Sequence, residues 1–177
     1  PGDIVYGYNR NFADFSVGGK DNIQAGNDNL TGGPGNDSLD GGEGEDTANY
    51  QNAAAGITVS LAQKEASNDG DGGRDVLTSI ENIIGSAHND AIYGDANANA
   101  LSGGDGADRI VGNSGADRLS GGAGNDTFVF KPGNGPNNVI TDYEAGDTID
   151  LQAFNISSAK VSEGTVNGSK VLTFDNI

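Results

Sequence analysis

The sequence has no cysteine, methionine or tryptophan, and only 9 of its 177 residues are lysine or arginine. Without cysteine, neither disulfide bonds nor thiolate metal sites can hold the chain together. The shortage of basic side chains argues against nucleic acid as a partner, because contacts to phosphate groups require clustered lysine and arginine. No apolar run is long enough to predict a membrane-spanning helix.

Apolar residues are also scarce, at 34%, and the formal net charge is −17. This combination is typical of disordered chains, because too little apolar surface is available to offset the entropy of the unfolded chain. The acidic residues are biased toward aspartate, which turns and metal sites prefer because its short side chain bonds the nearby backbone. We therefore expect the negative charge to be compensated by something from outside the chain.

Familiar catalytic patterns are missing as well. His88 is the only histidine, and the sequence contains neither H-E-x-x-H nor G-x-S-x-G. His88 is interpreted as a surface turn residue, and Ser114 as a loop residue. The sequence predicts no catalytic residue, so we expect a module that is not itself an enzyme.

Glycine is abundant, with 30 residues, and much of it recurs with a period of nine. Each nine-residue unit has glycine first, Asp or Asn sixth and an apolar residue eighth. The units span 32–40, 41–49, 85–93, 94–102, 103–111, 112–120 and 121–129. Two degenerate units with a seven-residue spacing lie upstream, at 18–24 and 25–31.

A nine-residue period accommodates one tight turn of six residues and one strand of three. The eighth residue is then the centre of the strand and points to the opposite side from its two neighbours. Two units make one coil of ~18 residues, and successive coils stack as parallel strands of a solenoid. The sequence therefore predicts an all-β fold, a parallel β-roll with a thin apolar core.

The segments outside the repeats complete a single module over 1–177. Residues 50–84, with alternating Ile57, Val59 and Leu61, predict an inserted β-hairpin packed on the roll. The tail 131–177 predicts a C-terminal β cap, because a solenoid needs capping elements at its ends. Residues 1–17 are expected to form an N-terminal cap, with 18–49 and 85–130 as the first and second repeat blocks.

The six-residue turn G-G-x-G-x-D carries the chemistry. Glycine allows backbone conformations that turn the carbonyl groups inward, and the sixth residue adds a carboxylate. Two stacked turns then offer about six oxygen ligands without histidine or cysteine, a set that suits Ca²⁺ better than Mg²⁺ or transition metals. We therefore expect several calcium ions as cofactors. Asp69, Asp71 and Asp75 of the insertion are either a separate calcium site or a solvated loop.

The units, above all GGPGNDSLD and GGAGNDTFV, resemble the RTX nonapeptide repeat, and GDIVYGYNRN resembles the start of serralysin-type C-terminal domains. The resemblance implies a calcium-binding β-roll of a secreted protein from a Gram-negative bacterium, exported by a type I secretion system and folding outside the cell. It implies sixth-position ligands at Asp21, Asp28, Asp37, Asp46, Asp90, Asn99, Asp108, Asp117 and Asp126. The turn glycines implied are Gly32, Gly33, Gly35, Gly41, Gly42, Gly44, Gly103, Gly104, Gly106, Gly112, Gly115, Gly121, Gly122 and Gly124. In the tail, Asp142, Asp147 and Asp150 resemble a calcium-binding turn.

We therefore expect a module that folds on binding calcium and stabilises or caps a larger extracellular protein, such as a protease, lipase or epimerase. The alternative is a module that binds a polysaccharide such as alginate for a secreted enzyme. That alternative requires an exposed basic or aromatic groove, for which Tyr50, Tyr93 and Lys131 are scattered candidates.

Overall fold

The computed structural model describes residues 4–6, 26–134, 137–151, 160–166 and 169–175. Strands, turns and bends make up this part of the chain, and it contains no helix. Accordingly, none of the described residues forms a helix long and apolar enough to cross a membrane. The all-β fold is as predicted.

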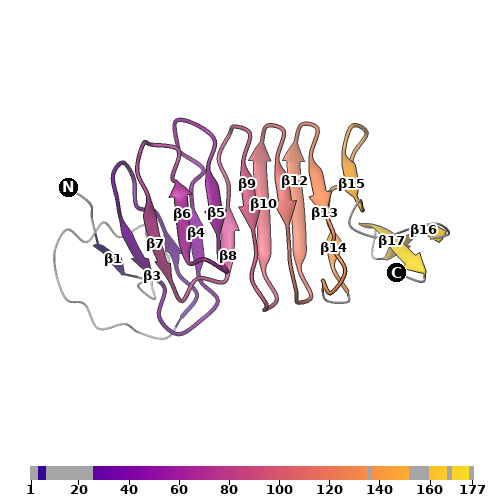
Figure 1. The fold of residues 1–177 in the computed structure, drawn as a ribbon, viewed down its shortest axis with the longest axis horizontal. Coiled ribbons are helices and arrows are strands. Elements are labelled where there is room, and N and C mark those ends of the chain that lie inside the picture. Colours follow the sequence, from indigo (N-terminus) through magenta and orange to yellow (C-terminus); the bar gives the residue numbers. More distant parts are fainter. Residues whose placement is uncertain (1–3, 7–25, 135–136, 152–159, 167–168, 176–177) are drawn as a thin grey trace.

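Two sheets face each other and run along the long axis of the molecule (Figure 1). The nine-stranded sheet contains, in spatial order, β1 (Ile4–Tyr6), β3 (Ser38–Asp40), β7 (Asp75–Thr78), β6 (Glu65–Asn68), β5 (Thr58–Ser60), β9 (Ala91–Tyr93), β11 (Arg109–Val111), β13 (Thr127–Val129) and β15 (Thr148–Asp150). The six-stranded sheet contains β14 (Val139–Ile140), β12 (Arg118–Ala123), β10 (Ala100–Asp105), β8 (Asn82–Ile84), β4 (Thr47–Asn49) and β2 (Asn29–Leu30).

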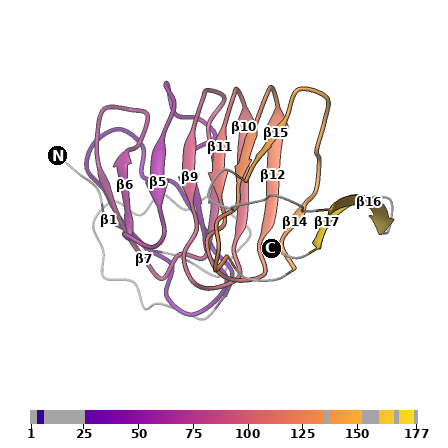
Figure 2. The same cartoon turned by 45° about the vertical axis from the view of Figure 1, so that its right-hand side comes forward.

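The register of the parallel strands follows the predicted coil. Leu101 lies beside Leu119 in one sheet, and Ile110 lies beside Phe128 in the other, each pair 18 residues apart. The chain crosses from one sheet to the other at each turn, so consecutive units alternate between the two sheets. Figure 2 shows the successive coils stacked along the axis. The parallel β-roll is confirmed.

The core is one column of side chains from each sheet. Every eighth-position residue of the seven units is at most 1% exposed. Its neighbours in the strand point outward, because side chains alternate across a strand. The interior is therefore apolar and narrow, with about one buried side chain per repeat, namely Leu39, Ala48, Ile92, Leu101, Ile110, Leu119 and Phe128.

The sequence analysis predicted an inserted hairpin packed on the roll, and the structure shows antiparallel inserted strands that are part of a sheet of the roll. Its strands β5, β6 and β7 lie within the nine-stranded sheet, between β3 and β9. β6 pairs antiparallel with both neighbours, whereas β5 and β7 pair parallel with β9 and β3. The hairpin is incorporated because its alternating apolar residues continue the core, with Val59 and Ala66 fully buried.

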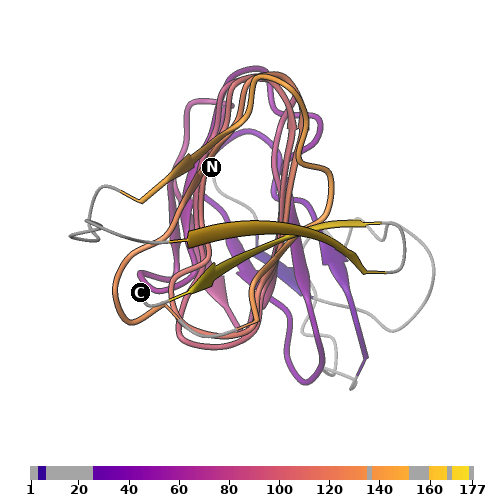
Figure 3. The ribbon, with the colours of Figure 1, turned by 90° about the vertical axis from the view of Figure 1, so that its right-hand side faces the viewer.

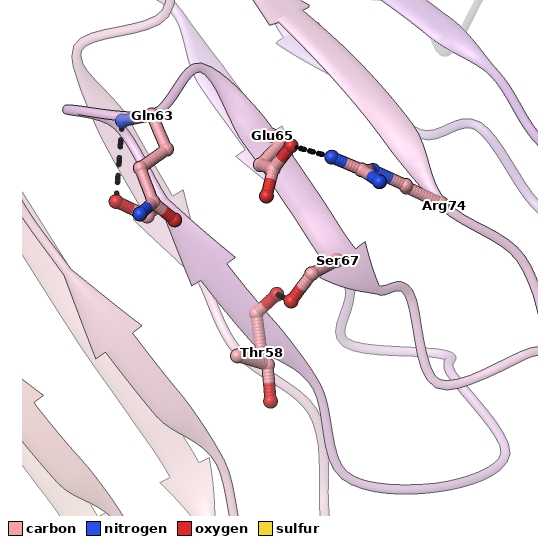
Figure 4. Close-up of polar contacts among 6 residues, drawn as sticks. Thr58, Gln63, Glu65, Ser67 and Arg74 are labelled. Carbon is pink, nitrogen blue, oxygen red and sulfur yellow. Dashed lines mark hydrogen bonds and ion pairs between the residues drawn. The ribbon is translucent and has the colours of Figure 1, made fainter.

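The polar groups of the inserted strands stay on the outer face (Figure 4). Arg74 forms an ion pair with Glu65, and the hydroxyl of Ser67 donates to the Thr58 carbonyl at 3.4 Å. These contacts tie β6 to its neighbours, although an exposed ion pair contributes only about 0–1 kcal/mol.

The C-terminal segment has two parts. Strands β14 and β15 continue the two sheets by one further coil. Strands β16 (Lys160–Val166) and β17 (Ser169–Asp175) form a separate antiparallel hairpin, which lies across the end of the roll (Figure 3). At the other end, β1 pairs with β3, and the rest of the expected N-terminal cap lies outside the described residues.

Candidate calcium sites

The sixth-position side chains of the nine-stranded sheet form a ladder across the stacked turns. The backbone N–H of Asp90 donates to Asp108 Oδ1 at 2.8 Å, and that of Asp108 donates to Asp126 Oδ1 at 2.9 Å. The N–H of Asp126 continues the ladder to Asp147 Oδ1 at 3.0 Å. One oxygen of each of these carboxylates therefore accepts a hydrogen bond from the backbone of the neighbouring coil.

A second ladder runs along the six-stranded sheet. The N–H of Asp28 donates to Asp46 Oδ1 at 2.7 Å, and that of Asp46 donates to Glu81 Oε2 at 2.8 Å. Further along, the N–H of Asn99 donates to Asp117 Oδ1 at 3.0 Å. Both edges of the roll thus carry a row of buried carboxyl groups.

The second oxygen of these carboxyl groups has a different environment. Among the described residues, no hydrogen bond reaches Oδ2 of Asp28, Asp46, Asp108, Asp117 or Asp126, and each of these side chains is at most 5% exposed. A buried carboxylate oxygen without a proton donor or a cation costs several kcal/mol.

Burial raises the pKa of these carboxyl groups. It raises the pKa of Asp108 to about 7, with the charges of Asp90 and Asp126 adding to the effect, and it raises the pKa of Asp117 to about 6. Burial is also the largest cause of the raised pKa values of Asp28, Asp46 and Asp126. The protein alone therefore disfavours the charged form that these residues need to bind a cation, and a bound cation would reverse that preference.

The first glycine of each turn makes room for the carboxylate. A Cβ atom on Gly103 would lie 2.1 Å from Asp108 Oδ2, and one on Gly121 would lie 2.1 Å from Asp126 Oδ2. A Cβ atom on Gly112 would likewise lie 2.2 Å from Asp117 Oδ2. The sixth residue therefore folds back over the first residue of its own unit, which only glycine permits.

The second and fourth glycines have another role. Gly122 and Gly124 have φ values of +93° and +142°, which favour glycine. A Cβ atom there would lie 1.9 Å and 1.6 Å from the carbonyl oxygens of Gly104 and Gly106 in the preceding coil. The turns stack this closely because they have no side chains, so backbone carbonyl groups of adjacent coils gather beside the carboxylates.

This donor set fits a hard cation. No three His, Cys, Asp or Glu side chains converge on one point within the described part of the chain, so a bound ion must take most ligands from backbone carbonyls. Within the same residues, only two ion pairs form, Arg74 with Glu65 and Arg109 with Asp150, and neither reaches the orphaned oxygens. Oxygen ligands in a carbonyl-rich turn suit calcium.

Comparison with known families decides the identity of the repeats. The family model of the RTX calcium-binding nonapeptide repeat, which comprises four copies, matches residues 24–49, 82–101 and 102–135. The chain contains RTX calcium-binding nonapeptide repeats. No curated protein matches it. The RTX repeat is a calcium-binding, non-catalytic repeat, so the chain contains a calcium-binding module.

The upstream RTX unit that contains Asp28 is in register with the later units. Leu30 lies beside Ala48, 18 residues away, and Asp28 donates to Asp46 in the same register. Leu30 and Asp28 therefore occupy the eighth and sixth positions of the nine-residue register, and Asp28 belongs to the ladder. Asp21 lies outside the described residues.

The two middle RTX units satisfy their sixth residue with protein groups. The N–H of Ser86 donates to Asp90 Oδ2 at 2.6 Å, and the Ser86 hydroxyl donates to Asp90 Oδ1 at 2.7 Å. Asn99 accepts from the N–H of Asp95 at 2.9 Å and donates to the Glu81 carbonyl at 2.9 Å. Both positions fit a cation less well than Asp108 or Asp117, because protein groups already pair their oxygens.

The three tail residues separate in the structure. Asp142 accepts from the N–H groups of Gly121 and Gly122 at 3.0 and 2.9 Å, so its carboxylate caps the last RTX turn. Asp147 occupies the next step of the ladder, with Oδ2 accepting from the N–H of Glu144 at 2.8 Å. Asp150 forms an ion pair with Arg109 at 3.8 Å. The tail is thus a further coil in which the carboxylates bind protein groups.

The sequence analysis missed two sixth positions. Glu81 accepts from the N–H of Asp46 and lies two residues before Ile83, which pairs with Leu101. Asp75 accepts from the N–H of Asp37 at 3.0 Å and lies two residues before Leu77. For Asp75 the signal was present in the sequence, because residues 70–78 (GDGGRDVLT) have glycine first, aspartate sixth and leucine eighth. For Glu81 the acid-x-apolar triplet was the available signal, since Val76 occupies the first position.

Proposed function

We propose that the chain folds when calcium binds and thereby stabilises a larger secreted protein. The observation that carries this proposal is the row of buried Oδ2 atoms without a proton donor, in a chain of net charge −17. Folding without a cation would place these charges side by side in a poorly solvated turn. Calcium supplies positive charge and accepts oxygen ligands there.

The residues proposed to hold calcium are sixth-position aspartates in the ladders that have a buried oxygen without a proton donor. Asp108 and Asp126 are one such pair, and Asp46 with Asp28, whose N–H donates to it and whose two carboxylate oxygens both lack a donor among the described residues, is another. Asp117 is proposed as a calcium ligand together with backbone carbonyl groups of its turn. Asp37 is proposed as a ligand because it occupies the sixth position of its unit. In each unit, the first, second and fourth glycines are proposed to supply backbone carbonyl oxygens.

The proposed setting follows from this dependence on calcium. A chain that remains unfolded at low calcium passes through a type I secretion system and folds in the calcium-rich medium outside a Gram-negative cell. The RTX match supports this setting, because RTX proteins typically follow that route. The roll would then serve as a folding and stabilising module of a protease, lipase or epimerase.

Polysaccharide binding receives little support from the described residues. Tyr50, one of the aromatic candidates for a sugar-binding groove, is 6% exposed and donates its hydroxyl to Asp75. It therefore cannot stack on a ligand at the surface. The expectation of a sugar-binding role remains a prediction without a site.

Far-UV circular dichroism of the full chain tests the proposed function. In excess chelator we expect a coil spectrum, and millimolar calcium should produce a β spectrum. Magnesium at the same concentration should have much less effect, because Mg²⁺ releases its water ligands reluctantly. A chain that is already fully β-structured in chelator would contradict calcium-dependent folding.

A further inference from the structure

Asp75, at a sixth position in the middle of the roll, has a proton donor for each carboxylate oxygen. Its Oδ1 accepts from the N–H of Asp37 at 3.0 Å, and its Oδ2 accepts from the hydroxyl of Tyr50 at 3.1 Å. The side chain of Asp75 is completely buried. Because both oxygens are paired with protein groups, this carboxyl group is satisfied without a cation.

The insertion and a serine pair Asp90 in the same way. The N–H of Ile57 donates to Asp90 Oδ1 at 2.8 Å, and Ser86 donates to both oxygens, as described above. At the next sixth position, Asn99 is neutral and donates its own amide to the Glu81 carbonyl at 2.9 Å. Protein groups thus do for Asp90 and Asn99 what they do for Asp75.

The repeats on either side of this region differ. Among the described residues, Asp46 before it and Asp108 after it each have a buried Oδ2 without a proton donor. We call residues 50–102, which lie between these two aspartates, the central block. Folding of the flanking repeats places uncompensated charge in poorly solvated turns. The flanking repeats therefore gain more from a bound cation than the central block does.

The central block also supplies most of the apolar core. Of the seventeen buried residues in the described core, eleven lie in 50–102, and only three lie in each of the flanking segments 26–49 and 103–130. The two flanking segments together are almost as long as the central block. Since the free energy gained on folding rises with the apolar area removed from water, the central block gains more for the same length of chain.

The strands of the insertion pair over short sequence distances. Val59 lies opposite Ala66, and Ala66 lies opposite Asp75, in two successive antiparallel pairs. In the repeats, each parallel pair joins strands 18 residues apart, such as Leu101 with Leu119. Closing a shorter loop costs less chain entropy, so the inserted strands can form before the parallel coils do.

We propose that the central block folds at a lower calcium concentration than the repeats on either side and is the nucleus on which they stack. It lies in the middle of the roll (Figure 1), where β9 and β10 pair with β11 and β12, and β7 and β8 pair with β3 and β4. The proposal rests on the calcium-dependent folding proposed above and adds an order to it.

The central block still contains uncompensated charge. Asp69 is 1% exposed, so it is buried and not solvated, and no described group donates a hydrogen bond to its Oδ2. It lies in the loop that stacks on the first repeat block, where the N–H of Arg74 donates to Asn36 Oδ1 at 2.8 Å. We therefore expect the central block to unfold in excess chelator as well, and to fold with less calcium than its neighbours.

Hydrogen–deuterium exchange of the full chain at graded calcium concentrations tests this order. We expect peptides that contain β5 and β9 to become protected at several-fold lower calcium than peptides that contain β11 and β13, which belong to the same sheet. Protection of both groups at one calcium concentration, or of 103–130 first, overturns the proposal and leaves calcium-dependent folding intact. Protection that does not depend on calcium anywhere in the chain contradicts both.

Tyr50→Phe tests the physical cause of the order. The variant keeps the ring and removes the hydroxyl that donates to Asp75 Oδ2. We expect the calcium concentration that protects the central block to rise several-fold, toward that of 103–130. Tyr93→Phe is the matched control, because Tyr93 is partly exposed on β9 and should leave that concentration unchanged. A Tyr50→Phe chain with the wild-type order and the wild-type calcium concentrations would overturn the proposal.

Discussion

At the scale of single residues, the two oxygens of one aspartate have separate tasks. Oδ1 of Asp108 accepts the N–H of Asp90 in the preceding coil, whereas Oδ2 has no proton donor among the described residues. A substitution that keeps the first oxygen and removes the charge of the second therefore isolates the effect of the cation from that of the fold.

We predict that Asp108→Asn raises the calcium concentration needed for half-folding about tenfold, equivalent to about 1.4 kcal/mol. The amide keeps the acceptor for Asp90 but cannot bind the ion as strongly. Asp105→Asn is the matched control, because Asp105 is exposed in the same turn. Calcium titrations followed by circular dichroism measure both, and equal shifts would refute the role of Oδ2.

The raised pKa values give a pH dependence whose sign can be stated. Folded Asp108 has a pKa of about 7 instead of 3.8, so the calcium-free chain takes up protons on folding. We predict that the chain in chelator gains β structure as the pH falls from about 7 toward about 4, and loses it above about 7.

With calcium bound, the carboxylates must be deprotonated, so the calcium midpoint should increase as the pH falls through the same window. Circular dichroism at a series of pH values, with chelator and with calcium, measures both effects. The same pH trend under both conditions would contradict competition between protons and calcium.

Gly103 gives a steric test of the turn. We predict that Gly103→Ala destabilises the calcium-bound chain by about 1–3 kcal/mol, because its Cβ would lie 2.1 Å from Asp108 Oδ2. Gly133→Ala is the control: nothing lies within 4 Å of its Cβ, and its φ of +90° adds only about 1 kcal/mol of strain. Urea unfolding in calcium compares the two variants.

At the scale of elements, the coil formed by units 85–93 and 94–102 differs from its neighbours. Ser86 supplies proton donors to Asp90, and the amide of Asn99 supplies its own donor. Protein hydrogen bonds in this coil occupy the oxygens that we propose bind calcium in other coils. The roll would therefore combine coils that require calcium with one coil that is closed by its own side chains.

We predict that Asp90→Asn leaves the number of calcium ions bound at saturation unchanged, in contrast to Asp108→Asn. In the wild type, the N–H of Ser86 donates to Asp90 Oδ2 at 2.6 Å. In the variant, the asparagine NH₂ group would face this N–H, so two donors would meet and the stability against urea should fall. Equilibrium dialysis together with urea unfolding measures the two effects. A lower calcium number would show that Asp90 is a ligand after all.

At the scale of the whole molecule, stability is distributed along one axis, because each coil contacts mainly its neighbours. A site with a dissociation constant of ~0.1 mM in ~1 mM calcium contributes roughly 1.4 kcal/mol. Several such sites add up to the stability of a small domain, which is about 5–15 kcal/mol. Calcium can therefore determine whether the roll folds at all.

Two truncations test how the roll is closed at its C-terminal end. Deletion of 131–177 removes β14, β15 and the ladder residue Asp147, whereas deletion of 152–177 removes only the segment with the β16–β17 hairpin. We predict that the longer deletion raises the calcium midpoint much more than the shorter one. If the longer truncation folds at the wild-type calcium concentration, the last coil is dispensable.

The sequence by itself determined the roll and much of its chemistry. A nine-residue period leaves room for one turn and one short strand, so the buried eighth residues and the sixth-position carboxylates followed from spacing alone. Asp108, Asp117 and Asp126 were identified in this way, because each is contained in a local motif whose first glycine and sixth acid contact one another.

Only the tertiary structure decided what depends on residues distant in the sequence. It placed the insertion within the sheet, because β6 and β7 find partners only once β3 and β5 are in position. It also showed that Ser86 pairs with Asp90 and that Asp142 caps the turn at Gly121. Whether a carboxylate oxygen is paired depends on which donors the fold brings to it, and repeat spacing contains no such information for groups from another coil.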